Sequence, residues 1–343
     1  MKEKASLSTL NLKALLSFCS SGIIKNTQTG HLNITRVVIN LEIVIKKIYT
    51  SMYKLFMEKN KMKRVALIND LSGFGKCSLT AAIPVISVMG IQACPLPTAI
   101  LTAQTGFGDF FCDDFTDRMD FFTEKWRVMD VAFDGIYSGY LASPLQIQKV
   151  MDFLEKFQNV NSLYLADPVM GDHGQFYSMV NDEFLEGMRK LTQMADVITP
   201  NLTELCFLAG ADYENLIACS EEDTYLDKIR ELCEELLSET NKSQVVVVTG
   251  ILRKKGNREY IGNLAVTKDE KNYVETLYTG TGFSGTGDLF ASVICGSLVK
   301  GFSISEAMKK ATNFLQEAIE EATRERIPRN HGVNFEKYLS KLL

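Results

Sequence analysis

From Met62 onward, short apolar runs alternate with stretches whose apolar residues recur at helical spacing. Runs rich in Val, Ile, Leu and Tyr predict buried strands over 64–70, 91–96, 132–140, 162–169, 196–201 and 244–250. Helical spacing between them predicts helices over 77–89, 110–127, 145–158 and 180–193. Strands separated by helices imply right-handed crossovers, so we predict an α/β fold: a mostly parallel central sheet with helices on both faces.

Polar residues collect where the predicted strands end. Asp70, Asp167, Asn201 and Thr249 each stand at the end of such a run. In an open parallel sheet, ligands bind outside the carboxyl ends of the strands. The sequence therefore predicts a binding site along that edge of the sheet.

The first 61 residues differ from the rest of the chain. They hold ten Lys and Arg against three Asp and Glu, whereas the remainder holds 27 against 39. Segment 35–57 is apolar and basic, which fits an amphipathic helix on a membrane surface or an extension translated from an early start codon. We favour the second interpretation, with a poorly ordered extension over 1–61 and the folded domain over 62–343.

Composition narrows the function classes. The net charge of −5 argues against nucleic acid as a partner. The sequence contains no run of 18 uncharged apolar residues, so no membrane span is predicted. Eight cysteines form no C-x-x-C pair and three histidines accompany them, so neither a zinc site nor a disulfide framework is expected. We predict a cytoplasmic protein.

The stretch YTGTGFSGTGDLFAS (278–292) supports two interpretations. Its G-x-G-x-x-G at 280–285 is typical of dinucleotide binding. Such a motif must be followed by a helix and then by a further strand, whereas only helices are predicted after Gly287. A dehydrogenase is thus a remote alternative. The segment SGFGKCS (72–78) also resembles a P-loop, but Cys77 stands where Ser or Thr is required.

The second interpretation is an anion pocket beside a catalytic acid. Gly285 and Gly287 allow a tight turn whose amides converge on one point, and the following helix adds unpaired N–H groups. Asp288 in its first turn could be the base of a phosphoryl transfer or an acid that only stabilises its own helix. Asp167, Asp172 and Glu204 offer hard oxygen ligands for Mg²⁺ at the same edge.

Six motifs in their order along the chain resemble the ribokinase superfamily, and within it the pyridoxal/pyridoxamine (vitamin B6) kinases. They are LTAQTGFGD (101–109), SGYL (138–141), DPVMGD (167–172), ITPNLTEL (198–205), VVVTG (246–250) and GTGDLFAS (285–292). The resemblance runs from about Met62 to about residue 325. It implies a ribokinase-like three-layer sandwich in which 62–343 is a kinase domain.

The resemblance also implies a role for each site residue. Asp288 would deprotonate the 5′-hydroxymethyl group of pyridoxal, pyridoxine or pyridoxamine. The anion hole would be formed by Gly285, Thr286 and Gly287. Mg²⁺ would be held by Asp167 and Glu204, with Asn201 beside them. ATP would be contacted by Asp172, Thr199, Asn201, Thr249 and Gly250. The pyridine ring would be lined by Asp70, Thr98 and Tyr140. The resemblance leaves open whether K⁺ is a further cofactor, and it implies a homodimer.

One departure from the family pattern leaves the substrate open. Many pyridoxal kinases carry Ser and His after the first strand, whereas this chain reads Asn69-Asp70-Leu71-Ser72, as in hydroxymethylpyrimidine kinases. The alternatives to a B6 kinase are therefore a hydroxymethylpyrimidine (phosphate) kinase and a non-catalytic pyridoxal-binding protein on the same fold.

Overall fold

A computed structural model describes Lys47, Ile48, Thr50 and residues 62–343, so the predictions for residues 1–61 fall, apart from those three positions, outside the described residues. The strands are β1 (Arg64–Ser72), β2 (Gln92–Leu101), β3 (Cys112–Asp114), β4 (Gly135–Ser138), β5 (Leu163–Ala166), β6 (Gly171–Asp172), β7 (Gln175–Phe176), β8 (Val197–Ile198), β9 (Val245–Lys255), β10 (Arg258–Val266) and β11 (Lys271–Leu277). The helices are α3 (Ser78–Val88), α4 (Thr116–Val128), α5 (Pro144–Phe157), α6 (Asp182–Gln193), α7 (Leu202–Ala209), α8 (Tyr213–Ala218), α9 (Tyr225–Ser238), α10 (Thr286–Val299), α11 (Ile304–Arg324) and the 3₁₀ turns η1 (Arg329–His331) and η2 (Phe335–Leu342).

Within residues 62–343, nine strands form one sheet in the order β11-β10-β9-β8-β5-β4-β1-β2-β3. The six strands from β9 to β2 pair in parallel, and β3, β10 and β11 pair antiparallel at the two edges. The strand order changes direction around β1, which places a topological switch point beside the carboxyl ends of β1 and β4.

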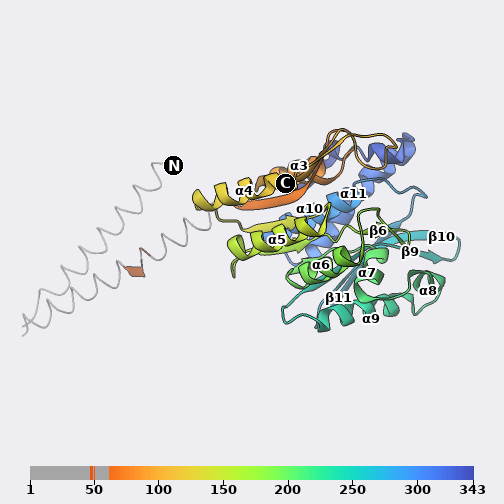
Figure 1. The fold of residues 1–343 in the computed structure, drawn as a ribbon. Coiled ribbons are helices and arrows are strands. Elements are labelled where there is room, and N and C mark those ends of the chain that lie inside the picture. Colours follow the sequence, from red (N-terminus) through yellow and green to blue (C-terminus); the bar gives the residue numbers. More distant parts are fainter. Residues whose placement is uncertain (1–46, 49, 51–61) are drawn as a thin grey trace, which may run out of the picture. The chain divides into compact units, whose positions relative to one another are not determined.

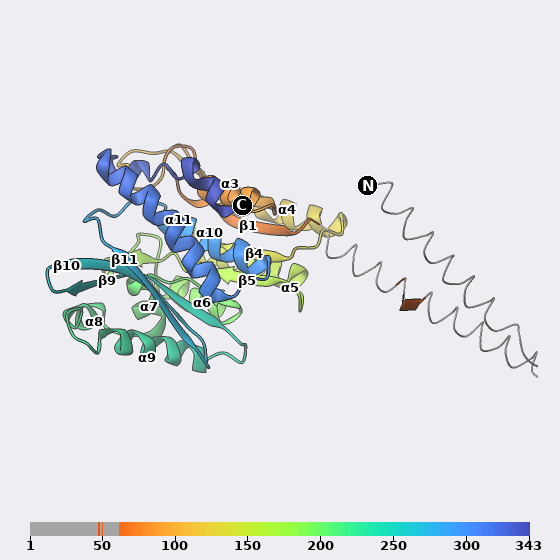
Figure 2. The ribbon, with the colours of Figure 1, turned by 180° about the vertical axis from the view of Figure 1, so that it is seen from behind.

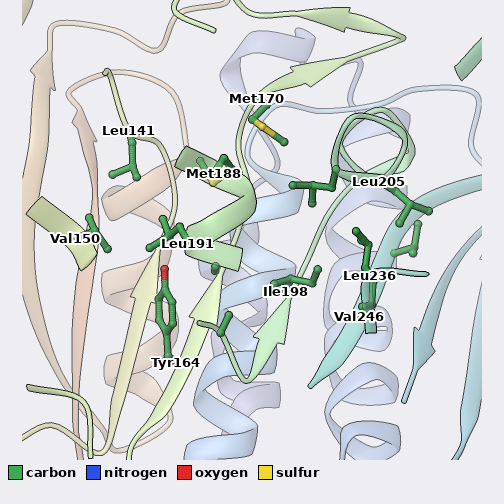
Figure 3. Close-up of a cluster of buried hydrophobic side chains, with 14 of the residues drawn as sticks. Leu141, Val150, Tyr164, Met170, Met188, Leu191, Ile198, Leu205, Leu236 and Val246 are labelled. Atoms are coloured by element: carbon green, nitrogen blue, oxygen red, sulfur yellow. The ribbon is translucent and has the colours of Figure 1, made fainter. Parts of the chain in front are cut away.

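Helices cover both faces of this sheet, as Figures 1 and 2 show for the coloured part of the chain. One apolar core lies under α3, α10 and α11, and the other under α4, α5, α6, α7 and α9. Figure 3 shows the second core, where Tyr164, Ile198 and Val246 of the sheet meet Val150 and Leu191 of the helices. The predicted α/β three-layer fold is confirmed.

The edges of the sheet differ from prediction. Residues 112–114 of the predicted helix 110–127 form β3, and β2 continues to Leu101 despite Pro95 and Pro97. On the side of β3, only the segment 99–101 of β2 is paired, and both prolines precede it. The N–H groups that the prolines lack are therefore not needed for hydrogen bonds to β3. The strands β10 and β11 were not predicted, although Gly256-Asn257 between β9 and β10 is a two-residue turn signal for the β9–β10 hairpin.

The chain after Gly287 is helical, as predicted. Ser303 and Glu306 form a capping box at the start of α11. Residues 288–343 contain no strand, so nothing after the glycine-rich stretch could complete a dinucleotide fold. Among the described residues, no helix is both long enough and apolar enough to cross a membrane.

Candidate functional site

The glycine-rich turn before α10 has a backbone that only glycine can adopt at its first position. Gly285 lies in the left-handed region at φ 82°, and a Cβ there would stand 1.8 Å from the carbonyl oxygen of Lys76. Gly287 opens toward free space, with no heavy atom within 4 Å of an added Cβ. No side chain caps α10, so its first amides and its positive dipole end face that space. The turn is therefore suited to an anion.

Asp288 stands in the first turn of α10, partly buried, with a second helix start beside it. Its Oδ1 accepts from Asn69 Nδ2 at 3.4 Å, and the backbone of Ser78 at the start of α3 also supports the carboxylate. Burial, with a smaller contribution from nearby Asp70, raises the pKa of Asp288, and the hydrogen bonds from Ser78 and Asn69 lower it, so that the net pKa is about 6. A carboxyl with a pKa near 6 is ionised at neutral pH and still basic enough to accept a proton.

Asn69 and Asp70, at the end of β1, connect Asp288 to the predicted ring-binding residues. Asn69 Oδ1 accepts from the amides of Asp70 at 3.0 Å and Tyr140 at 2.8 Å. Gly139 makes room for this side chain, because a Cβ at 139 would lie 2.3 Å from Asn69 Nδ2. The SGYL motif thus carries a glycine that Asn69 requires.

Tyr140, just beyond the end of β4, lies beside Thr98 of β2. Thr98 has no exposed surface and donates its hydroxyl to the carbonyl of Tyr140 at 2.9 Å. It therefore holds the Tyr140 backbone and does not present a free hydroxyl to a ligand. Burial raises the pKa of Tyr140 to about 12, and Asp70 is among the charges that add to it. Asp70 is itself buried, with a raised pKa, and accepts from Ser72 Oγ at 2.8 Å.

Two buried carboxylates follow β5 and β8. Asp167 accepts from Thr199 Oγ1 at 3.0 Å, and Glu204 accepts from the amides of Asn201 at 2.9 Å and Met170 at 3.2 Å. Burial raises the pKa of Asp167 and of Glu204, and the charge of Asp167 raises that of Glu204 further. Glu204 and Asn201 also form a capping box at the start of α7, which fixes both side chains.

The predicted nucleotide residues lie along the same edge. Thr249 of β9 pairs with Asn201 through an isolated parallel bridge, and Asn201 Nδ2 donates to the carbonyl of Gly171 at 2.9 Å. Gly250 follows in the left-handed region at φ 72° with open space around it. Asp172, next to Gly171 in β6, is partly exposed. The structure thus brings the predicted site residues together at the carboxyl ends of the parallel strands.

The charges at this edge fit a divalent cation. Among the described residues, no three His, Cys, Asp or Glu side chains converge as a protein-only metal site. Within residues 62–343, neither Asp167 nor Glu204 makes an ion pair, and nearby negative charge adds to burial in raising both pKa values: Asp288 acts on Asp167, and Asp167 acts on Glu204. Mg²⁺ binds through one or two carboxylates plus phosphate and water, and such a pair gains from its charge.

Two residues of this edge were not among the predicted site residues. Asn69 was noted only as a departure from the family pattern, although a polar doublet Asn69-Asp70 at the end of a strand is itself a signal for this edge. Arg329 lies on η1, where its carbonyl accepts from the amide of Ser284 at 3.1 Å, next to the glycine turn. Nothing in the local sequence around Arg329 indicated that position.

Comparison with known proteins places these residues in a family context. The family model described as phosphomethylpyrimidine kinase matches residues 77–333. A Bacteroides thetaiotaomicron protein assigned to the phosphomethylpyrimidine kinases, in a crystal form with pyridoxal, is 38% identical at a TM-score of 0.75 and covers 82% of this chain and 96% of that one. Pyridoxal kinase from Lactobacillus plantarum is 27% identical at a TM-score of 0.73, covering 82% and 97%.

Curated sequences give the same relationship over a shorter span. The pyridoxal kinase PdxY of Histophilus somni (strain 2336) is 29% identical over 192 residues, which is 54% of this chain and 63% of that protein. The alignment thus covers less than two thirds of that relative. Together with the solved structures, these matches confirm the predicted fold and the resemblance drawn from the six motifs.

Proposed function

Because the chain belongs to the phosphomethylpyrimidine kinase family, we propose that it transfers the γ-phosphoryl group of ATP to the 5′-hydroxymethyl group of a vitamin B6 vitamer. The observation that carries the proposal is the placement of Asp288 directly after the uncapped turn at Gly285–Gly287. A base for the alcohol and donors for the transferring group then stand next to each other, as phosphoryl transfer requires. The presence of pyridoxal in the crystal form of the 38% identical relative supports a B6 vitamer as substrate.

In this mechanism, the oxygen of the substrate hydroxyl attacks the γ-phosphorus of ATP while Asp288 accepts the proton of that hydroxyl. The amides of the glycine turn donate to the oxygens of the transferring group, whose charge is spread over them in the transition state. Asn69 holds the Asp288 carboxylate by its 3.4 Å contact, and the start of α3 stabilises the ionised form. The proton remains on Asp288, and the bond between the γ-phosphorus and the oxygen of the departing ADP breaks.

The acidic residues would hold the metal and the nucleotide. Mg²⁺ bound by Asp167 and Glu204 would neutralise charge on the phosphates. Thr199 orients Asp167 and Asn201 orients Glu204 through the bonds described above. Asp172, Thr249 and Gly250 would lie along the nucleotide. A cytoplasmic homodimer, with K⁺ as a further cofactor, completes the proposal.

A kinase assay with purified protein, ATP and Mg²⁺ tests the substrate. Pyridoxal, pyridoxine, pyridoxamine and hydroxymethylpyrimidine compete pairwise, and phosphorylated products are identified by mass. We expect the 5′-phosphate of at least one B6 vitamer as the main product. Phosphorylation of hydroxymethylpyrimidine alone would refute the B6 assignment, and binding of pyridoxal without any ATP turnover would make the protein a non-catalytic binder.

Hydroxymethylpyrimidine (phosphate) kinase is the second candidate, favoured by the Asn69-Asp70-Leu71-Ser72 segment at the end of β1. The chemistry and the base would be the same, and the two substrates differ in the ring that faces Asp70 and Tyr140. The competition assay above separates them.

A further inference from the structure

The 3₁₀ turn η1 near the C-terminus ties two parts of the site together. Asn330 donates Nδ2 to the carbonyl of Gly106 at 2.5 Å, and its own carbonyl accepts from Gln104 Nε2 at 3.1 Å. The ring of His331 lies against Phe74, with centroids 5.2 Å apart. The turn is therefore held against the loop that follows β2.

Arg329, the first residue of this turn, lies between the glycine turn and Asp172. The backbone carbonyl of Arg329 accepts from the amide of Ser284, one residue before Gly285, at 3.1 Å. The guanidinium Nη2 lies 3.6 Å from Asp172 Oδ2. The side chain thus runs from the glycine turn, which would hold the transferring phosphoryl group, to an acid that would lie near the ATP phosphates.

The charge of Arg329 also acts on Tyr177, the hydroxyl that the neighbouring carboxylates act on. Burial raises the pKa of the Tyr177 hydroxyl, and Glu204, Asp172 and Asp167 raise it further, whereas Arg329 lowers it. The guanidinium and these three acids therefore act on the same hydroxyl, and the guanidinium's measured contact with an acid is the one to Asp172. The Arg329 side chain is 60% exposed and makes one ion pair within residues 62–343, so most of its five N–H donors are open to a ligand.

The charge balance of the site calls for such a cation. Five carboxylates line this edge, namely Asp70, Asp167, Asp172, Glu204 and Asp288. In residues 62–343, Asp172 alone of these five has an ion-pair partner, and its partners are Arg329 and His173. ATP adds further negative charge, and a guanidinium matches phosphate oxygens by its planar fork of donors.

We propose that Arg329 binds the γ-phosphoryl group of ATP and stabilises it during transfer, which rests on the proposed kinase function. In the structure described, the guanidinium is paired with Asp172. When nucleotide and metal occupy the acidic residues, it turns from Asp172 to the phosphoryl oxygens above the glycine turn. Because the bond to Ser284 uses the Arg329 backbone, substitution of the side chain leaves the turn in place.

The test compares Arg329→Gln and Arg329→Lys with the control Arg324→Gln, an exposed arginine at the end of α11. Isothermal titration measures ADP and a non-hydrolysable ATP analogue, each with Mg²⁺, and steady-state assays measure kcat and KM. Arg329→Gln should weaken the analogue at least roughly tenfold and leave ADP within about twofold, because only the analogue carries the γ-phosphoryl group. Its kcat should fall by roughly 10- to 100-fold, less than an enclosed arginine finger supplies, because this guanidinium faces solvent.

Arg329→Lys should keep part of both effects, and Arg324→Gln should match the wild type. Equal affinities of wild type and Arg329→Gln for the analogue, or equal losses for ADP and analogue, would overturn the assignment. An unchanged kcat in Arg329→Gln would do the same. If the wild-type protein phosphorylates no vitamer, the proposed function fails, but the two titrations still decide whether Arg329 binds the γ-phosphoryl group.

Discussion

Replacing Asp288 by Asn should abolish most activity and at the same time stabilise the protein. The carboxylate is held in a place that raises its pKa from 3.8 to about 6. A shift of roughly two units corresponds to at most about 3 kcal/mol, and partial exposure together with the imperfect fit of an amide lowers the expected gain to about 1–2 kcal/mol. For a domain of this size, such a gain raises Tm by about 2–6 °C.

The size of the stability gain depends on pH. Asp288 binds its proton more tightly in the folded than in the unfolded protein, so it contributes stability at low pH that is lost as pH rises through about 6. The Asn variant lacks this dependence. The stability difference between variant and wild type should therefore be small near pH 4 and reach its full value above about pH 7.

Urea unfolding at both pH values measures the stability, and steady-state kinetics measures the activity. A general base contributes about 10²–10⁴-fold, so kcat of Asp288→Asn should fall at least roughly 100-fold while nucleotide affinity stays nearly constant. Asp269→Asn, in the exposed turn between β10 and β11, serves as a control of equal charge change. Near-normal kcat would refute the base assignment, and a variant less stable than wild type at pH 7.5 would refute the account of its burial.

Four further predictions follow from the same geometry. Gly285→Ala should lower stability by about 2 kcal/mol or more, because its φ is 82° and a Cβ would stand 1.8 Å from a backbone carbonyl; thermal unfolding should show Gly287→Ala unchanged or slightly stabilised, since its Cβ meets open space. Asn69→Ala leaves two buried amides without an acceptor and should cost about 1–3 kcal/mol in urea unfolding, with a lower kcat; a wild-type kcat would contradict its role. Glu204→Gln should raise the Mg²⁺ concentration for half-maximal rate by about 10- to 100-fold, and an unchanged Mg²⁺ titration would exclude Glu204 from the metal site. The acid limb of kcat/KM should titrate near pH 6, the pKa of Asp288; a flat profile down to pH 5 would contradict it.

The fold could be predicted where burial is continuous along the chain. The four valines of 245–248 form an inner part of β9, and the central strands are apolar on both faces, as expected for a parallel sheet covered by helices. The hairpin β10–β11 was not predicted because its strands are partly exposed and carry charged residues, so no long apolar run indicates them in the sequence. The turn at Gly256-Asn257, which joins β9 to β10, was the stronger signal that β10 follows.

The candidate site could be predicted where its residues belong to short motifs. Gly285 to Asp288 are adjacent in sequence, and Asn201 and Glu204 are one helical turn apart. The contact of Asn69 with Asp288 joins residues 219 positions apart, and Arg329 meets Asp172 only because η1 folds back to the sheet edge. Such contacts depend on the packing of whole elements, which no local pattern encodes.

A crystal structure with pyridoxal, Mg²⁺ and a non-hydrolysable ATP analogue tests the central claim most directly. The account predicts the 5′-hydroxyl oxygen at about 2.6–3.2 Å from an Asp288 carboxyl oxygen, with the γ-phosphoryl group on the amides of Gly285–Gly287. A vitamer bound with its hydroxymethyl group away from Asp288, or a γ-phosphoryl group bound elsewhere, would contradict it.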